Sequence, residues 1–281
     1  MLNALLSPVF LVVALGCTIL AIASAAMGCV CTLKGQALIG DALGNAAFPG
    51  VVLAFMFFMT KDPLILILGA AATGLLGFWL ISVLSQKTKL SQDSLLAVVA
   101  SSFFGCGMVL KSYISGNPRW SEISQAGLQN YIFGQASYIM KQDVVTISII
   151  CALSLGVFFL FYKEIKLYIF DPTLAATFGY KSKTMDTIIL LATVFIIAAG
   201  LKVTGAILIS AMLIGPYVIA KAHARTFGGL IVTSAFWASV SCVTGIAAAT
   251  LMPGLATGPT IIVTMSILAA ASLGIAALRR N

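Results

Sequence analysis

The chain is a series of long, continuous apolar runs separated by short polar connections. Nine runs carry little or no charge, and they cover residues 6–32, 40–60, 63–85, 94–114, 143–162, 186–203, 205–222, 228–250 and 259–278. A helix needs about 20 apolar residues to cross the hydrocarbon core of a bilayer. The pattern therefore predicts an all-α polytopic membrane protein with eight or nine transmembrane helices.

The boundary between the sixth and seventh runs decides between eight and nine helices. Only Lys202-Val203-Thr204-Gly205 separates them, and the seventh run is short. The sequence is compatible with two spans or with one partly broken or re-entrant segment at this place.

Composition narrows the class of protein further. Of 281 residues, 60% are apolar and 9% are charged, whereas soluble domains carry about 25% charged residues. An ordinary cytosolic enzyme, a nucleic-acid binder and a disordered chain are excluded by this scarcity of charge. Outer-membrane barrels show alternating polarity in runs of about ten residues, which is not the pattern here. We treat residues 1–281 as one transmembrane domain.

The basic residues predict an orientation in the membrane, because cytoplasmic loops are enriched in Lys and Arg. If the connection after the first run lies inside the cell, eleven of the sixteen basic residues fall on the inner side. These are Lys34, Lys87, Lys89, Lys163, Lys166, Lys181, Lys183, Lys221, Arg225, Arg279 and Arg280. The N-terminus is then outside and the C-terminus is cytoplasmic.

A long connection on the inner side, residues 163–185, contains signals for a short helix. Asp171 can cap its start, Pro172 suits its first position, and Gly179 can end it. Such a helix could dock a soluble partner, or it could simply connect two spans. The pattern alone gives these two alternatives similar weight.

Asp41 is the one acidic residue placed at or just inside a predicted span. Asp41 and Asn45 are four residues apart, as are Gly40 and Gly44, so each pair shares a helix face. The glycines would allow close approach of another helix, and Pro49-Gly50 should disturb the helix further on. The two oxygen-bearing side chains suit a hard or borderline cation such as manganese. Alternatively, Asp41 merely caps its helix.

Other catalytic or ligand sets are missing from the sequence. His223 is the single histidine and lies between Lys221 and Arg225, a poor setting for a metal ligand. The six cysteines lie in apolar runs, as buried cysteines do. No GxxxxGK[ST] phosphate loop occurs, so an ATPase driving this protein would be a separate chain. We expect a transport subunit that binds no cofactor of its own.

Several segments resemble the permeases of metal-ion ABC importers, the ABC-3 family. Residues 34–51, KGQALIGDALGNAAFPGV, are similar to the family segment KGxALxGDALSHAxLPGV. Glu164 with Phe170-Asp171-Pro172, Ala175 and Gly179 resembles its cytoplasmic segment. Residues 204–216 and 253–262 resemble its later signatures, in the same order along the chain.

The resemblance implies a type II importer architecture, related to the vitamin B12 importer permease, in a bacterial inner membrane. Two permease subunits would enclose the ion path, and a cytoplasmic ATPase dimer would hydrolyse ATP. An extracytoplasmic binding protein would deliver the metal ion. The resemblance also implies that the segment around Glu164, Phe170, Asp171, Ala175 and Gly179 docks the ATPase, which favours docking over a mere connection.

One departure from the family pattern bears on the ion. The family usually has Ser-His where this chain has Gly44-Asn45. Asp41 carries over as a residue of the metal path, with Gly40, Gly44, Pro49 and Gly50 shaping its helix. An amide oxygen in place of imidazole weakens the case for zinc and favours manganese or ferrous iron. A second, non-identical permease could instead supply the histidine.

Two functions from different classes remain. The first is the permease of an ATP-driven importer for manganese, zinc or iron. The second is a proton- or sodium-coupled carrier that works without an ATPase, a class in which internal repeats are common. No convincing internal repeat supports the second alternative.

Overall fold

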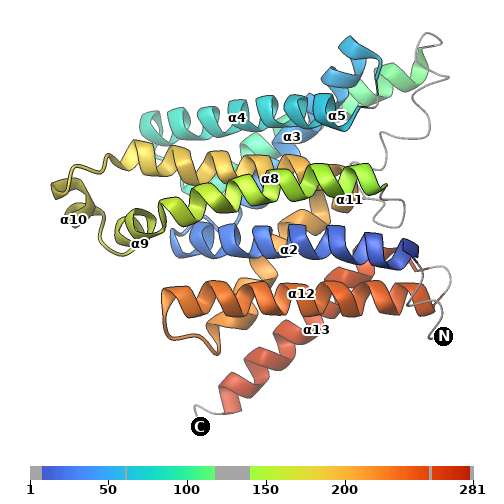
Figure 1. Ribbon diagram of the computed structural model, residues 1–281. Coiled ribbons are helices and arrows are strands. Elements are labelled where there is room, and N and C mark those ends of the chain that lie inside the picture. Colours follow the sequence, from blue (N-terminus) through green and yellow to red (C-terminus); the bar gives the residue numbers. More distant parts are fainter. Residues whose placement is uncertain (1–7, 61, 118–139, 253–254, 279–281) are drawn as a thin grey trace.

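The computed structural model describes residues 8–60, 62–117, 140–252 and 255–278. In these ranges eight helices are long and apolar enough to cross a membrane, and they run side by side (Figure 1). Their bounds are α2 (Pro8–Leu33), α3 (Ile39–Phe58), α4 (Pro63–Lys87), α5 (Gln92–Gly116), α8 (Lys141–Leu160), α11 (Ser182–Lys221), α12 (Phe227–Leu251) and α13 (Thr257–Leu278). Two short helices, α9 (Tyr162–Phe170) and α10 (Pro172–Thr177), project at one end. The all-α membrane fold expected from the apolar runs is confirmed.

The sixth and seventh apolar runs form one element, the bent helix α11. Its 40 residues would be about 60 Å long if straight, twice the roughly 30 Å of a hydrocarbon core. Gly205 interrupts the helical backbone with φ 73° and ψ 168°, a conformation that is essentially restricted to glycine. Of the two alternatives that the sequence left open, the structure has the single broken segment: the second half continues directly from the first through this bend.

Side-chain contacts show that the two halves of α11 run in opposite directions across the bundle. At its start, Asp186 pairs with Lys34, at the end of α2 beside α9. Near the bend, Lys202 Nζ lies 2.5 Å from Oδ1 of Asp143, at the beginning of α8 and the other end of the bundle. After α11 the chain returns to Phe227, whose ring contacts α9. The second half of α11 therefore runs back toward the end of the bundle at which α11 begins.

The two ends of the bundle differ in charge as the sequence predicts. The inner-side lysines and Arg225 that the structure describes lie at the end that carries α9 and α10, which we call the α9–α10 end. The start of α2 and the end of α13 lie at opposite ends of the bundle (Figure 1).

Helix α11 occupies the centre of the bundle. It packs against α2, α3, α4, α8, α12 and α13. The core around it is filled by large apolar side chains such as Leu20, Met27, Phe48 and Phe55. Five of the six cysteines are buried in this core, as expected, and Cys106 is exposed.

Candidate functional site

Helix α3 presents the predicted pair of oxygen-bearing side chains. Asp41 lies in its first turn and is exposed, and Asn45 is half-buried one turn later. Asn45 Nδ2 donates a hydrogen bond to Asp41 Oδ1 at 3.3 Å. The residue at the helix cap is Leu38, with no side-chain hydrogen bond to the helix. Asp41 is therefore paired with Asn45, and the alternative that it serves as the helix cap is not supported.

The two side chains form a small uncovered patch at the start of a helix that is mostly buried. Leu53 and Met56 are half-buried further along the same face, but Pro49 and Val52 between them and Asn45 are buried. The covering elements are α4, α5 and α11. The acid of α3 thus lies on the side of the helix that its own chain leaves open.

Glycines let α11 approach α3 next to this pair. A Cβ atom on Gly40 would lie 2.5 Å from Cδ1 of Leu213, and one on Gly44 would lie 3.9 Å from the Cβ of Ala206. Both contacts are made with the second half of α11. The expected close approach is therefore tight at Gly40 and of ordinary van der Waals distance at Gly44.

The predicted disturbance at Pro49-Gly50 does not break α3, which continues through both residues to Phe58. Pro49 has no N–H group, so the carbonyl oxygen of Asn45 loses its partner within the helix. Gly50 packs against α4, where an added Cβ would lie 2.0 Å from the carbonyl oxygen of Gly69. Pro49 therefore leaves the Asn45 carbonyl oxygen without a partner in the helix, and Gly50 allows α3 and α4 to come into contact. Helix α3 remains continuous.

The segment α9–α10 has the local structure that its sequence predicts. The carboxylate of Asp171 accepts a hydrogen bond from the N–H of Leu174 at 2.9 Å, and Pro172 is the first residue of α10. Bonds from the Thr173 hydroxyl and the Leu174 N–H hold the pKa of Asp171 below its usual value. Gly179 follows the helix with φ 88°. The short capped helix is confirmed.

This segment exposes large apolar side chains at the end of the bundle. Phe170, Leu174 and Phe178 are 62%, 43% and 68% exposed, while Ala175 is buried and anchors α10. Glu164 has one carboxylate oxygen buried without a hydrogen-bond partner among the described residues. An exposed apolar surface on a capped, anchored helix is typical of a docking site.

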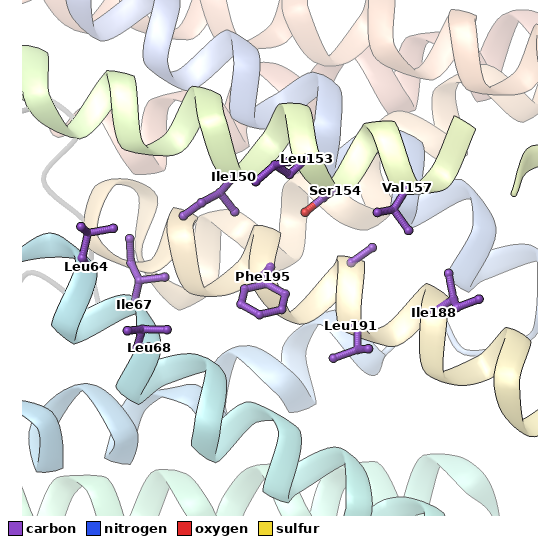
Figure 2. Close-up of a pocket in the computed structure, with 11 residues that line it drawn as sticks. Leu64, Ile67, Leu68, Ile150, Leu153, Ser154, Val157, Ile188, Leu191 and Phe195 are labelled. Atoms are coloured by element: carbon purple, nitrogen blue, oxygen red, sulfur yellow. The ribbon is translucent and has the colours of Figure 1, made fainter. Parts of the chain in front are cut away.

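A well-formed apolar groove lies elsewhere in the bundle. It has a volume of about 540 Å³ and is bounded by α4, α8 and α11 (Figure 2). Leu64, Leu153 and Phe195 are among its lining residues, and Ser154 contributes its single side-chain oxygen. A lining of this kind offers no set of ligands for a cation, so the groove is not an ion path.

Other metal ligands do not assemble in the described part of the chain. No group of three or more His, Cys, Asp or Glu side chains comes together there. His223 Nε2 lies 3.1 Å from the hydroxyl of Ser272, in keeping with a structural role. The pairings of Lys34 with Asp186 and of Lys202 with Asp143 cannot be predicted from the sequence, because no local pattern specifies which span ends meet.

Comparisons with known proteins agree with this architecture. A solved structure, "PsaBC from Streptococcus pneumoniae in complex with Fab", superposes with a TM-score of 0.83 at 23% identity, covering 96% of this chain and 93% of that chain. Its similarity shows the fold.

Curated relatives carry the comparison to the level of a family. The manganese transport system membrane protein MntC of Bacillus subtilis is 36% identical over 90% of this chain, which spans 58% of that relative's length. The zinc transport system membrane protein TroC of Treponema pallidum is 33% identical, covering 93% of this chain and 87% of the relative. The chelated iron transport system membrane protein YfeD of Yersinia pestis is 31% identical, covering 85% and 76%. The model of the ABC 3 transport family matches residues 7–276, and the chain therefore belongs to this family.

Proposed function

We propose that the chain is the permease subunit of an ATP-driven importer for divalent transition-metal ions in a bacterial inner membrane. The observation that carries this proposal is the Asp41–Asn45 pair in the uncovered patch at the start of α3, in a chain of this family. Relatives are named for manganese, zinc and chelated iron transport. Membership of an ABC family also weighs against a carrier that works without an ATPase.

The donors on α3 favour manganese. Asp41 supplies a carboxylate and Asn45 an amide oxygen, and the carbonyl oxygen freed by Pro49 lies one turn further along the helix. All three are oxygen ligands, which suit manganese, whereas zinc favours nitrogen and sulfur. A single chain supplies too few ligands for an octahedral ion. Water or a second permease subunit facing the same patch would complete the coordination.

The α9–α10 end would face the cytoplasm and dock the ATPase dimer. The inner-side basic residues gather at this end, as they do on cytoplasmic faces. Phe170, Leu174 and Phe178 give α9–α10 an exposed apolar surface for the partner. Asp171 and Gly179 fix the ends of α10, and Ala175 holds it against the bundle. An extracytoplasmic binding protein would deliver the ion at the opposite end.

Transport in proteoliposomes tests the proposal directly. The chain would be purified by a tag with the subunits that accompany it and reconstituted, and uptake of Mn²⁺, Zn²⁺ and Fe²⁺ would be measured. We expect uptake that needs ATP and is blocked by vanadate, with Mn²⁺ preferred. Uptake driven by a proton or sodium gradient without ATP would contradict the proposal and support a secondary carrier.

A substitution at Asn45 tests the preference for manganese. Asn45→His introduces the residue usual in the family and a nitrogen ligand beside Asp41. We expect Zn²⁺ to compete with Mn²⁺ uptake about tenfold more strongly, which needs only about 1.4 kcal/mol of added affinity. Asn45→Gln is the matched control, because it keeps an amide and should leave the competition unchanged. Equal competition in both variants would remove Asn45 from selectivity.

A further inference from the structure

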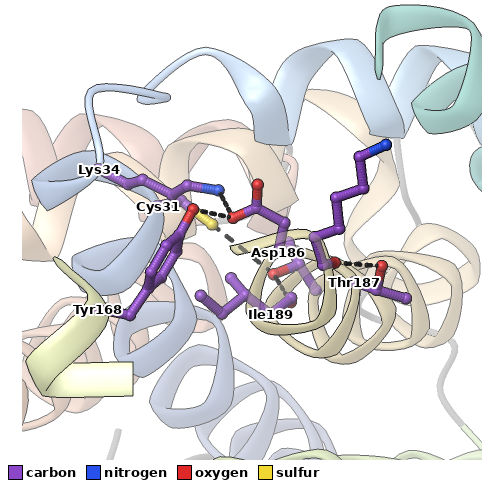
Figure 3. Close-up of polar contacts among 8 residues, drawn as sticks. Cys31, Lys34, Tyr168, Asp186, Thr187 and Ile189 are labelled. Carbon is purple, nitrogen blue, oxygen red and sulfur yellow. Dashed lines mark hydrogen bonds and ion pairs between the residues drawn. The ribbon is translucent and has the colours of Figure 1, made fainter. Parts of the chain in front are cut away.

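Three separate elements meet at one carboxylate oxygen at the α9–α10 end (Figure 3). Lys34, in the connection between α2 and α3, forms an ion pair with Oδ1 of Asp186 near the start of α11. Tyr168, on α9, donates its hydroxyl to the same Oδ1 at 2.7 Å. The Nζ atom of Lys34 also lies 5.6 Å from the centre of the Tyr168 ring.

The three side chains are largely covered by the rest of the protein. Their contacts therefore differ from those of an ion pair on a fully solvated surface. Tyr168 is 8% exposed, and the side chains of Lys34 and Asp186 are 14% and 32% exposed. Burial, reinforced by the bond to Asp186, raises the pKa of Tyr168, so its hydroxyl remains a donor at physiological pH. Hydrogen bonds to an ionised group are about twice as strong as neutral ones.

The residues on either side of this cluster belong to the two functional parts proposed above. Tyr168 lies on the same short helix as Phe170, at the beginning of the exposed apolar surface. Lys34 lies in the short connection that leads into α3, whose first turn carries Asp41. Asp186 belongs to α11, the central helix that packs against α3. Polar contacts therefore connect α9 directly to the start of α3, so a displacement of α9 would act on the start of α3 through them.

We infer that Tyr168, Asp186 and Lys34 form a relay that couples movement of the docking segment to the ion-path helix. This inference rests on the proposed function. Movement of α9 on the ATPase would act through the hydroxyl of Tyr168 on Asp186, and through Asp186 on Lys34 and the start of α3. The three are positioning residues: they touch neither the ion nor ATP, and they set whether hydrolysis and transport stay linked.

Tyr168→Phe tests the relay with the loss of one atom, because the ring and its contact with Lys34 are kept. The complete transporter, with its ATPase, would be reconstituted, and Mn²⁺ uptake and ATP hydrolysis would be measured together. We expect ATP hydrolysis to continue while Mn²⁺ transported per ATP falls about fivefold or more, the lower limit of usual coupling between sites. Tyr162→Phe removes the same atom from the same helix and should leave the ratio unchanged.

A second variant distinguishes a relay from a merely structural contact. Lys34→Met should lower the same ratio, and the double variant Lys34→Met/Tyr168→Phe should be no worse than the poorer single one, because both act through Asp186. Additive losses, or equal falls in hydrolysis, uptake and thermal stability with an unchanged ratio, would overturn the relay. So would a normal ratio in Tyr168→Phe. Wild-type protein without ATP-driven uptake would instead overturn the proposed function, and the relay with it.

Discussion

Asp41→Ala should nearly abolish metal uptake and leave the protein folded. The substitution removes the one carboxylate of α3, from an exposed position whose described hydrogen bond is to Asn45. Loss of an outer-shell partner costs metal sites about 10- to 100-fold in affinity or activity, and loss of a direct ligand should cost at least as much. The measurement is Mn²⁺ uptake at matched levels of protein in the membrane.

The fold should tolerate this change, so the loss can be assigned to the ion path. An acid in the first turn of a helix contributes only about 0.3–1 kcal/mol through the helix dipole. Asp93→Ala is the matched control, because Asp93 is the first-turn acid of α5 and is also exposed. It removes the same dipole contribution and should leave uptake near the wild-type level. Normal uptake by Asp41→Ala at normal protein level would remove Asp41 from the mechanism.

The charge-neutral variant separates charge from shape at this position. Asp41→Asn keeps the size of the side chain and its oxygen, and it removes the negative charge that attracts a divalent cation. We expect Asn to fail nearly as completely as Ala, whereas Asp41→Glu should retain part of the uptake. A fully active Asn variant would mean that the side chain serves the packing of the path and not the binding of the ion.

The features that the sequence predicted correctly depend on residues that are close together along the chain. For α10, the cap, the first position and the terminating glycine are all specified by Asp171, Pro172 and Gly179, and the structure has each in that role. The pairing of Asp41 with Asn45 follows from their spacing of four residues on one helix. In both cases the interacting atoms belong to neighbouring turns of the chain, so no knowledge of the tertiary arrangement is needed.

The bend of α11 and the cluster at Asp186 could not be predicted from nearby residues alone. Gly205 in an apolar run is compatible with a loop, a break or a bend, and it is the packing of the two halves in the bundle, with Gly200 beside Leu20 of α2 and Leu213 beside Gly28 of α2, that selects the bend. The meeting of Lys34, Tyr168 and Asp186 depends on three elements far apart in the sequence. In the sequence, each of the three is simply a polar residue near the end of a segment. No periodic pattern predicts that they come into contact.

Gly50→Ala should strongly reduce the amount of folded protein. The added Cβ would lie 2.0 Å from the carbonyl oxygen of Gly69 and 2.2 Å from the hydroxyl oxygen of Thr73. The first of these is a backbone atom, so α3 and α4 would have to move apart. Overpacking of a core costs about 1–3 kcal/mol and occasionally more. We expect lower yield and a lower thermal midpoint in detergent, with uptake reduced because α3 also carries Asp41.

Gly156→Ala on α8 is the matched control for this steric argument. It makes the same change within a transmembrane helix, but its Cβ meets nothing within 4 Å in the described structure. Because alanine favours helix over glycine by about 1 kcal/mol, this variant should be as stable as the wild type or slightly more so. Gly69→Ala should behave like Gly50→Ala, since its Cβ would lie 2.5 Å from the carbonyl oxygen of Gly50. A Gly50→Ala protein with an unchanged thermal midpoint would show that α3 and α4 are not in backbone contact at this point, and the close crossing that positions the helix carrying Asp41 would be wrong.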